Sequence, residues 1–215
     1  MKILVLGEHN ENEIQQATLC VVDAAKKLGG EIDIMLTTNA SDKVVNQAST
    51  IDSVSKVLHF SNERFQNIVG EDVAECALSI SDDYDFFLTS SSTTGKNILP
   101  RIAAKLDIQQ ISEIIEIIDP KTFKKPIYAG SCIATVSTSQ KKNALTIRTT
   151  SFDKAELGSG SAVVETKNCP NFSSRRTDFV KNELTVSDRP ELTAADIIVS
   201  GGRGMQNADN FALLD

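Results

Sequence analysis

The sequence predicts an α/β fold with a mostly parallel sheet and helices on both faces. Short apolar runs, typical of strands buried on both sides, recur through the first hundred residues. A helix-length segment separates each of these runs from the next, as right-handed crossovers between parallel strands require. The 215 residues, 40% hydrophobic and 24% charged, suit a globular chain of one full domain and part of another.

The first half of the chain supplies four strands and three helices in alternation. The expected strands are residues 3–6, 32–36, 54–60 and 84–88. Apolar residues three and four apart predict a helix over 14–28, which the Gly29-Gly30 pair ends. Ser41 and Asp42 can cap a short helix through about residue 50, and Ser61 can cap another through Ala77.

The second half begins with a helix over 97–106, in which Pro100 is tolerated because it falls in the first turn. The isoleucine-rich run 111–118 predicts one strand. Segments 126–136 and 144–149 flank a polar turn and predict a β-hairpin, which adds a smaller antiparallel region to the fold. Residues 162–167 form a further possible strand, and 184–193 resemble a linker.

Composition excludes several classes of function. The net charge of −7, with basic residues only in doublets, gives no polybasic surface for nucleic acid or anionic lipid. Tryptophan is absent and aromatic residues make up 5%, which disfavours stacking on bases. Because no apolar run approaches the ~20 residues of a membrane span, we expect no membrane insertion. No signal or transit peptide is visible, so we expect a cytoplasmic protein or an already processed chain.

The cysteines and histidines do not form a recognisable metal or catalytic pattern. Cys20, Cys76, Cys132 and Cys169 lie far apart, so we expect buried free thiols in a reducing compartment. Two histidines, His9 and His59, are too few for a metal cluster. No Ser/His/Asp, HExxH or paired-glutamate arrangement is present, so we predict no catalytic centre and no metal site.

Polar residues follow three of the predicted strands, at 7–10, 37–39 and 89–96, where ligands sit in parallel sheets. The loop from Ser90 to Lys96 precedes a helix, and its backbone N–H groups and lysine could hold a phosphate. It lacks the first glycine of a P-loop, and Asn97 stands where that motif has Ser or Thr. A helix N-cap at Thr93 or Thr94 is the favoured alternative.

A second candidate lies near the end of the chain. Residues 194–200 predict a short buried strand, Ser200-Gly201-Gly202-Arg203-Gly204 a glycine-rich turn, and 207–214 the first turns of a helix. Glycines let the backbone approach phosphate oxygens, and Arg203 could pair with a diphosphate. The residues alone leave a cofactor loop and a simple tight turn equally open.

Several blocks, taken together, resemble the alpha subunit of electron transfer flavoprotein. These blocks are the segment from Thr94 to Asp107 with Ile111 to Ile114, the segments 127–130, 149–152 and 187–192, and Val199 to Gly204. They occur in order and cover the whole chain. The resemblance implies an N-terminal domain of the adenine nucleotide alpha hydrolase-like fold, followed by a C-terminal domain that holds FAD.

The resemblance also implies a function. The family carries electrons, including those of fatty acid beta-oxidation, from acyl-CoA and other dehydrogenases through FAD to a membrane quinone oxidoreductase. The alpha subunit forms a heterodimer with a beta subunit, which its N-terminal domain contacts. Arg203 stands where the family's arginine contacts FAD, with Ser200, Gly201, Gly202 and Gly204 forming the loop. A eukaryotic member would work in the mitochondrial matrix.

We therefore expect an N-terminal α/β domain over residues 1–190. Residues 191–215 would be the first strand, loop and helix start of a truncated FAD domain. A chain of this extent should mainly supply the surface that docks the beta subunit and should not retain FAD by itself. The alternative is a nucleotide-binding regulatory α/β module that works without flavin and uses the loop at Ser90 to Lys96.

Overall fold

The computed structural model of the chain describes residues 1–39, 42–173, 175, 177, 179–181, 183 and 197–214. Two compact units are present, Met1–Phe179 and Val180–Asp215. The predicted boundary at 190/191 falls among residues outside the described ranges, and it stays a prediction. None of the helices in these ranges combines the length and the apolar character needed to cross a membrane.

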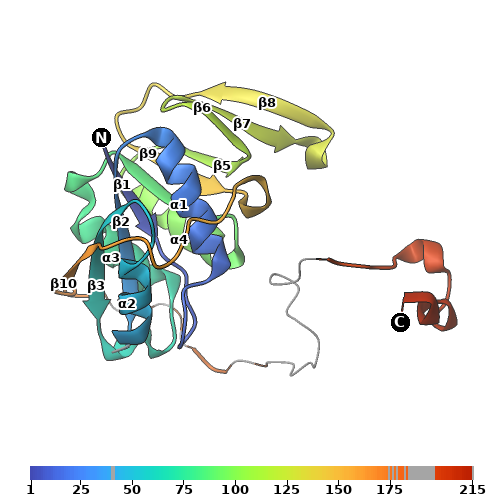
Figure 1. The fold of residues 1–215 in the computed structure, drawn as a ribbon, viewed down its shortest axis with the longest axis horizontal. Coiled ribbons are helices and arrows are strands. Elements are labelled where there is room, and N and C mark those ends of the chain that lie inside the picture. Colours follow the sequence, from blue (N-terminus) through green and yellow to red (C-terminus); the bar gives the residue numbers. More distant parts are fainter. Residues whose placement is uncertain are drawn as a thin grey trace. The chain divides into compact units, whose positions relative to one another are not determined.

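The first unit is built on a seven-stranded parallel sheet, which confirms the α/β prediction (Figure 1). The strand order is β10-β3-β2-β1-β4-β9-β5, with every neighbouring pair parallel. The strands are β1 (Lys2–Leu6), β2 (Glu31–Thr38), β3 (Val54–Ser61), β4 (Phe86–Ser90), β5 (Gln110–Ile114), β9 (Asn143–Ile147) and β10 (Val163–Lys167).

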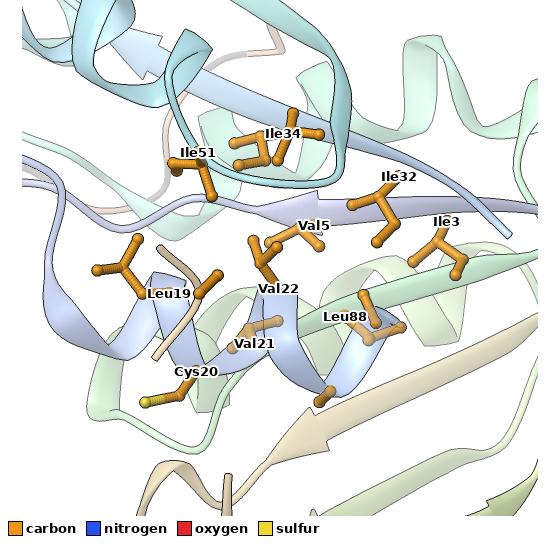
Figure 2. Packing of buried hydrophobic residues seen from close by; sticks show 14 of the residues in the cluster. Ile3, Val5, Leu19, Cys20, Val21, Val22, Ile32, Ile34, Ile51 and Leu88 are labelled. Atoms are coloured by element: carbon orange, nitrogen blue, oxygen red, sulfur yellow. The ribbon is translucent and has the colours of Figure 1, made fainter. Parts of the chain in front are cut away.

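Two helices cover each face of this sheet. α1 (Gln16–Leu28) and α2 (Asp42–Ser49) pack into one hydrophobic cluster, and α3 (Gly70–Ser79) and α4 (Thr93–Lys105) into the other. Figure 2 shows Val21 and Val22 of α1 beside Val5 of β1 and Leu88 of β4. Because hydrophobic core covers both faces of β1, the side chains that point to either face have to be apolar, which explains the continuous apolar run.

A second sheet packs over α1. It joins β6 (Glu116–Asp119), β7 (Thr122–Ile127) and β8 (Cys132–Ser137) in antiparallel order. Phe123 is fully buried there, and Ile117 and Val136 pack against the cluster that contains α1. The predicted antiparallel region therefore exists.

The strand pairing in this antiparallel region differs from that of the predicted hairpin. β8 pairs with β7, whereas β9 enters the main sheet between β4 and β5 and runs parallel to both. All five residues of β9 are buried, as expected of a central strand and not of a hairpin arm with one solvated face. The polar stretch before β9 connects two sheets. It was predicted as a hairpin turn because a turn signal does not reveal the partner of the next strand.

The predicted strand 111–118 is also two strands. β5 ends at Ile114 and β6 begins at Glu116, so the chain leaves one sheet for the other at Ile115. The amide of Ile115 already donates to the carbonyl of Lys124 in β7, at 2.9 Å. A run of isoleucines satisfies either sheet, which is why periodicity alone did not separate them.

Two helix predictions need correction. The helix expected from Ser61 is a 3₁₀ turn, η1 (Glu63–Gln66), capped by Asn62, followed by three non-helical residues and then α3. Ile68 lies in that break and is exposed, although its spacing predicted an inward position. α4 begins at Thr93 instead of Asn97, so Pro100 lies inside the helix and cannot donate to the carbonyl of Lys96.

The second unit is small and irregular where it is described. Residues 197–200 form no strand, and Ile197, Ile198 and Val199 are exposed. 3₁₀ turns follow at η5 (Arg203–Met205) and η6 (Ala208–Leu214). A buried strand needs paired neighbours, and the described residues of this unit contain no other strand to pair with. Residues 194–196 of the predicted strand lie outside the described ranges.

Candidate functional site

The carboxyl ends of β1, β2 and β4 meet around a pocket of about 310 Å³. Polar residues predicted to gather at this edge do so, because parallel strands end at one side of a sheet. The pocket is closed on the other side by the first turns of α3 and α4. Its lining comprises Leu6, Gly7, Glu8, His9, Gln15, Met35, Thr37, Ile68, Gly70, Val73, Thr89, Thr93, Thr94, Asn97 and Ile98.

Glu8 occupies the end of this pocket beside the first turn of α4. Its Oε1 accepts hydrogen bonds from the hydroxyls of Ser90 and Ser92, at 2.5 and 2.9 Å, and its Oε2 accepts from Ser92 at 2.8 Å. Ser92 is the N-cap of α4, and its hydroxyl oxygen also accepts from the amide of Gly95 at 2.9 Å. The N-cap is therefore Ser92, where Thr93 or Thr94 was predicted.

The glycine and lysine of the predicted phosphate loop have other tasks. A Cβ at Gly95 would lie 2.1 Å from the carbonyl oxygen of Ser90, so this glycine allows α4 to approach β4 closely. Lys96 Nζ lies 2.5 Å from Glu113 Oε1, and Lys96 is not among the lining residues. The loop from Ser90 to Lys96 thus binds the Glu8 carboxylate through its serine hydroxyls at the start of α4. Its lysine pairs with Glu113 instead of pointing into the pocket.

His9 and Thr89 complete the polar lining. Both ring nitrogens of His9 lie against carbonyl oxygens, those of Asn10 and Thr37, at 2.8 and 3.0 Å. Thr89 is buried, and its hydroxyl has no hydrogen-bond partner among the described residues. No group of three or more potential metal ligands occurs in the described part of the chain.

The four cysteines are free thiols, as predicted. Burial raises the pKa of the Cys20 and Cys76 thiols, which makes them poor nucleophiles. Cys132 is exposed, contrary to the expectation of a buried thiol, because it begins β8 at an edge of the smaller sheet.

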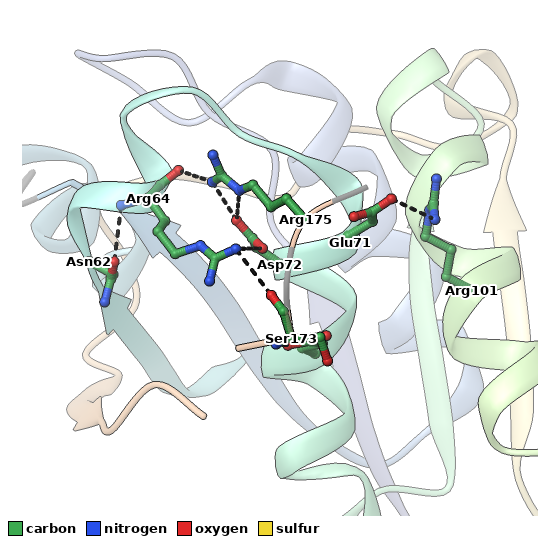
Figure 3. Close-up of polar contacts among 8 residues, drawn as sticks. Asn62, Arg64, Glu71, Asp72, Arg101, Ser173 and Arg175 are labelled. Atoms are coloured by element: carbon green, nitrogen blue, oxygen red, sulfur yellow. Dashed lines mark hydrogen bonds and ion pairs between the residues drawn. The ribbon is translucent and has the colours of Figure 1, made fainter. Parts of the chain in front are cut away.

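A polar clamp holds the segment after β10 against α3 (Figure 3). The buried carboxylate of Asp72 lies between two guanidinium groups, with Arg64 Nη2 3.2 Å from Oδ1 and Arg175 Nε 2.8 Å from Oδ2. The ring of Phe172 packs edge-on against Phe65, with centroids 5.9 Å apart. Sequence spacing did not indicate this cluster, because Asp72 and Arg175 are 103 residues apart.

The glycine-rich loop near the end of the chain is open. Ser200, Gly201, Gly202, Arg203 and Gly204 are all exposed. A Cβ at Gly202 or Gly204 would have no atom within 4 Å, so the backbone there can be approached closely. The Arg203 side chain makes no hydrogen bond or ion pair with any residue that the structure describes. A guanidinium that pairs with no described residue, next to accessible backbone, has the charge and the donors to bind the diphosphate of a dinucleotide.

Comparison with known proteins gives the same family over nearly the whole chain. The family model described as "Electron transfer flavoprotein domain" matches residues 3–170. The chain is 47% identical over 214 residues to electron transfer flavoprotein subunit alpha of Pseudomonas aeruginosa, covering 100% of this chain and 69% of that protein.

Eukaryotic relatives are similar over the same extent. Identity is 35% over 213 residues to the probable mitochondrial alpha subunit of Caenorhabditis elegans, covering 98% of this chain and 64% of the relative. It is 36% over 227 residues to the mitochondrial alpha subunit of Dictyostelium discoideum, covering 99% and 64%. The chain thus spans about two thirds of the length of these relatives.

Proposed function

Because the chain belongs to the electron transfer flavoprotein alpha-subunit family, we propose that it works as part of an electron carrier and not as an enzyme. The carrier would take electrons from acyl-CoA and other dehydrogenases and pass them to a membrane quinone oxidoreductase. The observation that carries this proposal is the similarity of the whole chain to alpha subunits, at 47% identity in the bacterial relative.

The cofactor we propose is FAD, bound in part by the loop from Ser200 to Gly204. FAD supplies the redox chemistry when bound, and the protein sets its position and electrostatic surroundings. Arg203 would pair with a negatively charged group of the cofactor, and Gly202 and Gly204 would let the backbone come close. The support in this chain is the exposed Arg203, which pairs with no described residue, and the open space at both glycines.

The N-terminal unit would serve mainly to dock the beta subunit. One surface that suits this role is the exposed end of the β7–β8 hairpin, where Ile127, Tyr128 and Ile133 are solvent-accessible. Tyr128 and Ala129 hold this turn with positive φ angles of 50° and 53°. Exposed apolar side chains at a well-ordered turn are typical of a subunit contact.

The flavin-free nucleotide alternative is less well supported. It required Lys96 to hold a phosphate at the start of α4, yet Lys96 pairs with Glu113. Glu8 places its own negative charge at the same helix start. A phosphate there would meet a carboxylate instead of a free cation.

The FAD proposal can be tested in the flavin-loaded alpha–beta complex. Arg203→Ala should weaken flavin retention about tenfold or more, since a charge-assisted hydrogen bond is worth roughly 1.5–3 kcal/mol. Arg203→Lys should restore part of it, and Lys181→Ala, which removes an exposed charge in the same unit, should change nothing. Flavin absorbance per complex after gel filtration is the measurement. Equal flavin content in Arg203→Ala would contradict the proposed role.

A further inference from the structure

The strand-end pocket contains a charged group, the Glu8 carboxylate, that has no role in the proposed electron transfer through the C-terminal loop. Glu8 is half-buried within it, and its carboxylate accepts from the hydroxyls of Ser90 and Ser92, with the Ser92 hydrogen shared between the two oxygens. No lysine or arginine in the described ranges forms an ion pair with it. The pocket therefore contains a fixed carboxylate without a cationic partner.

This carboxylate lies beside the first turn of α4. The first turn of a helix attracts negative charge through its free N–H groups and its dipole. Ser92 links the two, because its hydroxyl oxygen accepts from the Gly95 amide and its hydroxyl hydrogen is donated to Glu8, so the negative charge of Glu8 is held next to the helix start. A ligand phosphate or carboxylate would be repelled by Glu8 at short range.

Among the described residues, the rest of the pocket lining contains no lysine or arginine. The Thr89 hydroxyl is buried against Gly95 of α4 and is not accessible from the pocket. His9 is engaged on both ring nitrogens by carbonyl oxygens, and Lys96 is held by Glu113 outside the pocket. A carboxylate with no lysine or arginine beside it in the described lining complements a ligand that donates hydrogen bonds and carries positive charge.

The apolar side chains of the pocket walls determine which kind of carbon skeleton the ligand can have. Leu6, Met35, Val73 and Ile98 line one side with alkyl groups, and the described lining contains no Phe, Tyr or Trp. Quaternary ammonium groups are usually held by aromatic faces, whereas alkyl walls suit an aliphatic chain. At about 310 Å³ the pocket lies at the small end of the range for ligand sites.

We propose that this pocket binds a small aliphatic primary ammonium compound. The ammonium group would contact the Glu8 carboxylate, and the alkyl chain would lie against Leu6, Val73 and Ile98. The lining residues of this pocket belong to the first unit and the loop from Ser200 to Gly204 to the second. Glu8 determines the preference of the pocket for cations over phosphates.

A set of matched probes tests this inference on the 215-residue chain. Calorimetry with n-hexylammonium, n-hexanol and hexanoate compares one alkyl chain with three head groups. We expect saturable binding of n-hexylammonium, with hexanoate at least tenfold weaker and hexanol between them. AMP serves as the phosphate probe and should bind no better than hexanoate.

Variants separate the charge from the cavity. Glu8→Gln should weaken n-hexylammonium about tenfold or more and leave hexanol unchanged. Glu13→Gln removes the same charge from the same loop outside the lining and should have no effect. Glu8→Asp keeps the charge and should keep the preference for n-hexylammonium over hexanoate, which provides a second test if Glu8→Gln unfolds. Circular dichroism checks the fold of each variant.

The inference is overturned if n-hexylammonium shows no saturable binding, or if hexanoate or AMP binds as well as it does. Unchanged affinity in a folded Glu8→Gln variant, or a Glu8→Asp variant that binds hexanoate as well as n-hexylammonium, would also overturn it. Saturable AMP binding that is lost in Lys96→Ala would instead favour a nucleotide site at this edge. None of these results depends on flavin, so the electron-carrier proposal is tested separately.

Discussion

The Ser92 hydroxyl joins the start of α4 to the end of β1, because its oxygen accepts from the Gly95 amide and its hydrogen is donated to the Glu8 carboxylate. One side chain therefore serves as helix cap and as support for the charge in the strand-end pocket. Both roles depend on the hydroxyl, and alanine at this position would lose them together.

We expect Ser92→Ala to lower the free energy of unfolding by about 1–3 kcal/mol, since a lost N-cap alone costs roughly 0.5–2 kcal/mol. Urea denaturation measures the change, with Ser161→Ala, an exposed serine, as the control. Ser92→Thr should recover most of the loss. If Ser92→Ala and the wild type have the same urea midpoint of unfolding, the Ser92 hydroxyl does not stabilise the protein and this prediction is wrong.

The Arg64–Asp72–Arg175 clamp should contribute to the stability of the first unit. Asp72→Ala leaves two guanidinium groups without their shared carboxylate. Because both arginines keep partial access to water, we expect a loss of about 1–3 kcal/mol, below the 3–5 kcal/mol of a fully buried pair.

A double-mutant cycle isolates the contact between Asp72 and Arg175. The loss in Asp72→Ala/Arg175→Ala should be smaller than the sum of the two single losses, because the pair acts as a unit. Asp82→Ala, in an exposed 3₁₀ turn, is the control. Strictly additive losses would show that the two side chains do not interact in solution.

His59 should make stability depend on pH. It is buried against the Thr38 hydroxyl, at 2.8 Å from Nε2, and burial lowers its pKa from 6.5. Below pH 6.5 the unfolded chain therefore binds a proton that the folded protein does not, so stability falls as the pH drops toward the folded pKa.

Urea denaturation of wild type and His59→Gln between pH 7.5 and about 5 tests this dependence. The difference in unfolding free energy should shift in favour of the variant as the pH falls through this window, because glutamine does not titrate. A parallel pH dependence of the two proteins would contradict the assignment to His59.

Sequence patterns predicted the strands of the central sheet well because the signal for each strand lies within one short run of residues. Each apolar run, such as the one in β1, carries its own signal, and each strand of the first hundred residues is followed by its crossover helix. The partner of a strand is not local. β9 reads like one arm of a hairpin, and only the space between β4 and β5 determines where it inserts.

The candidate site shows the same limit. Strand-end positions located the pocket, because parallel strands end together. That Glu8 would occupy the helix start, and that Lys96 would turn to Glu113, depend on contacts between residues 84 and 17 positions apart. The Ser200-to-Gly204 loop was identified from its glycines and its arginine, the resemblance assigned FAD to it, and its ligand role remains a prediction.

Flavin retention gives a further prediction for this chain. Purified alone, it should carry no stoichiometric flavin, because the exposed loop from Ser200 to Gly204 provides only one charged contact for a large cofactor. The visible absorbance spectrum of the purified chain, before and after incubation with FAD and desalting, is the measurement. One flavin per chain after desalting would contradict this expectation.

The most direct test of the account is assembly with the beta subunit of electron transfer flavoprotein. A tagged form of this 215-residue chain would be co-expressed with the beta subunit, and the captured material analysed by light scattering after gel filtration. The account predicts a one-to-one complex, weakened when Tyr128 and Ile133 are replaced by serine but not when Ile68, also exposed, is replaced. A chain that elutes alone, with no beta subunit bound, would contradict it.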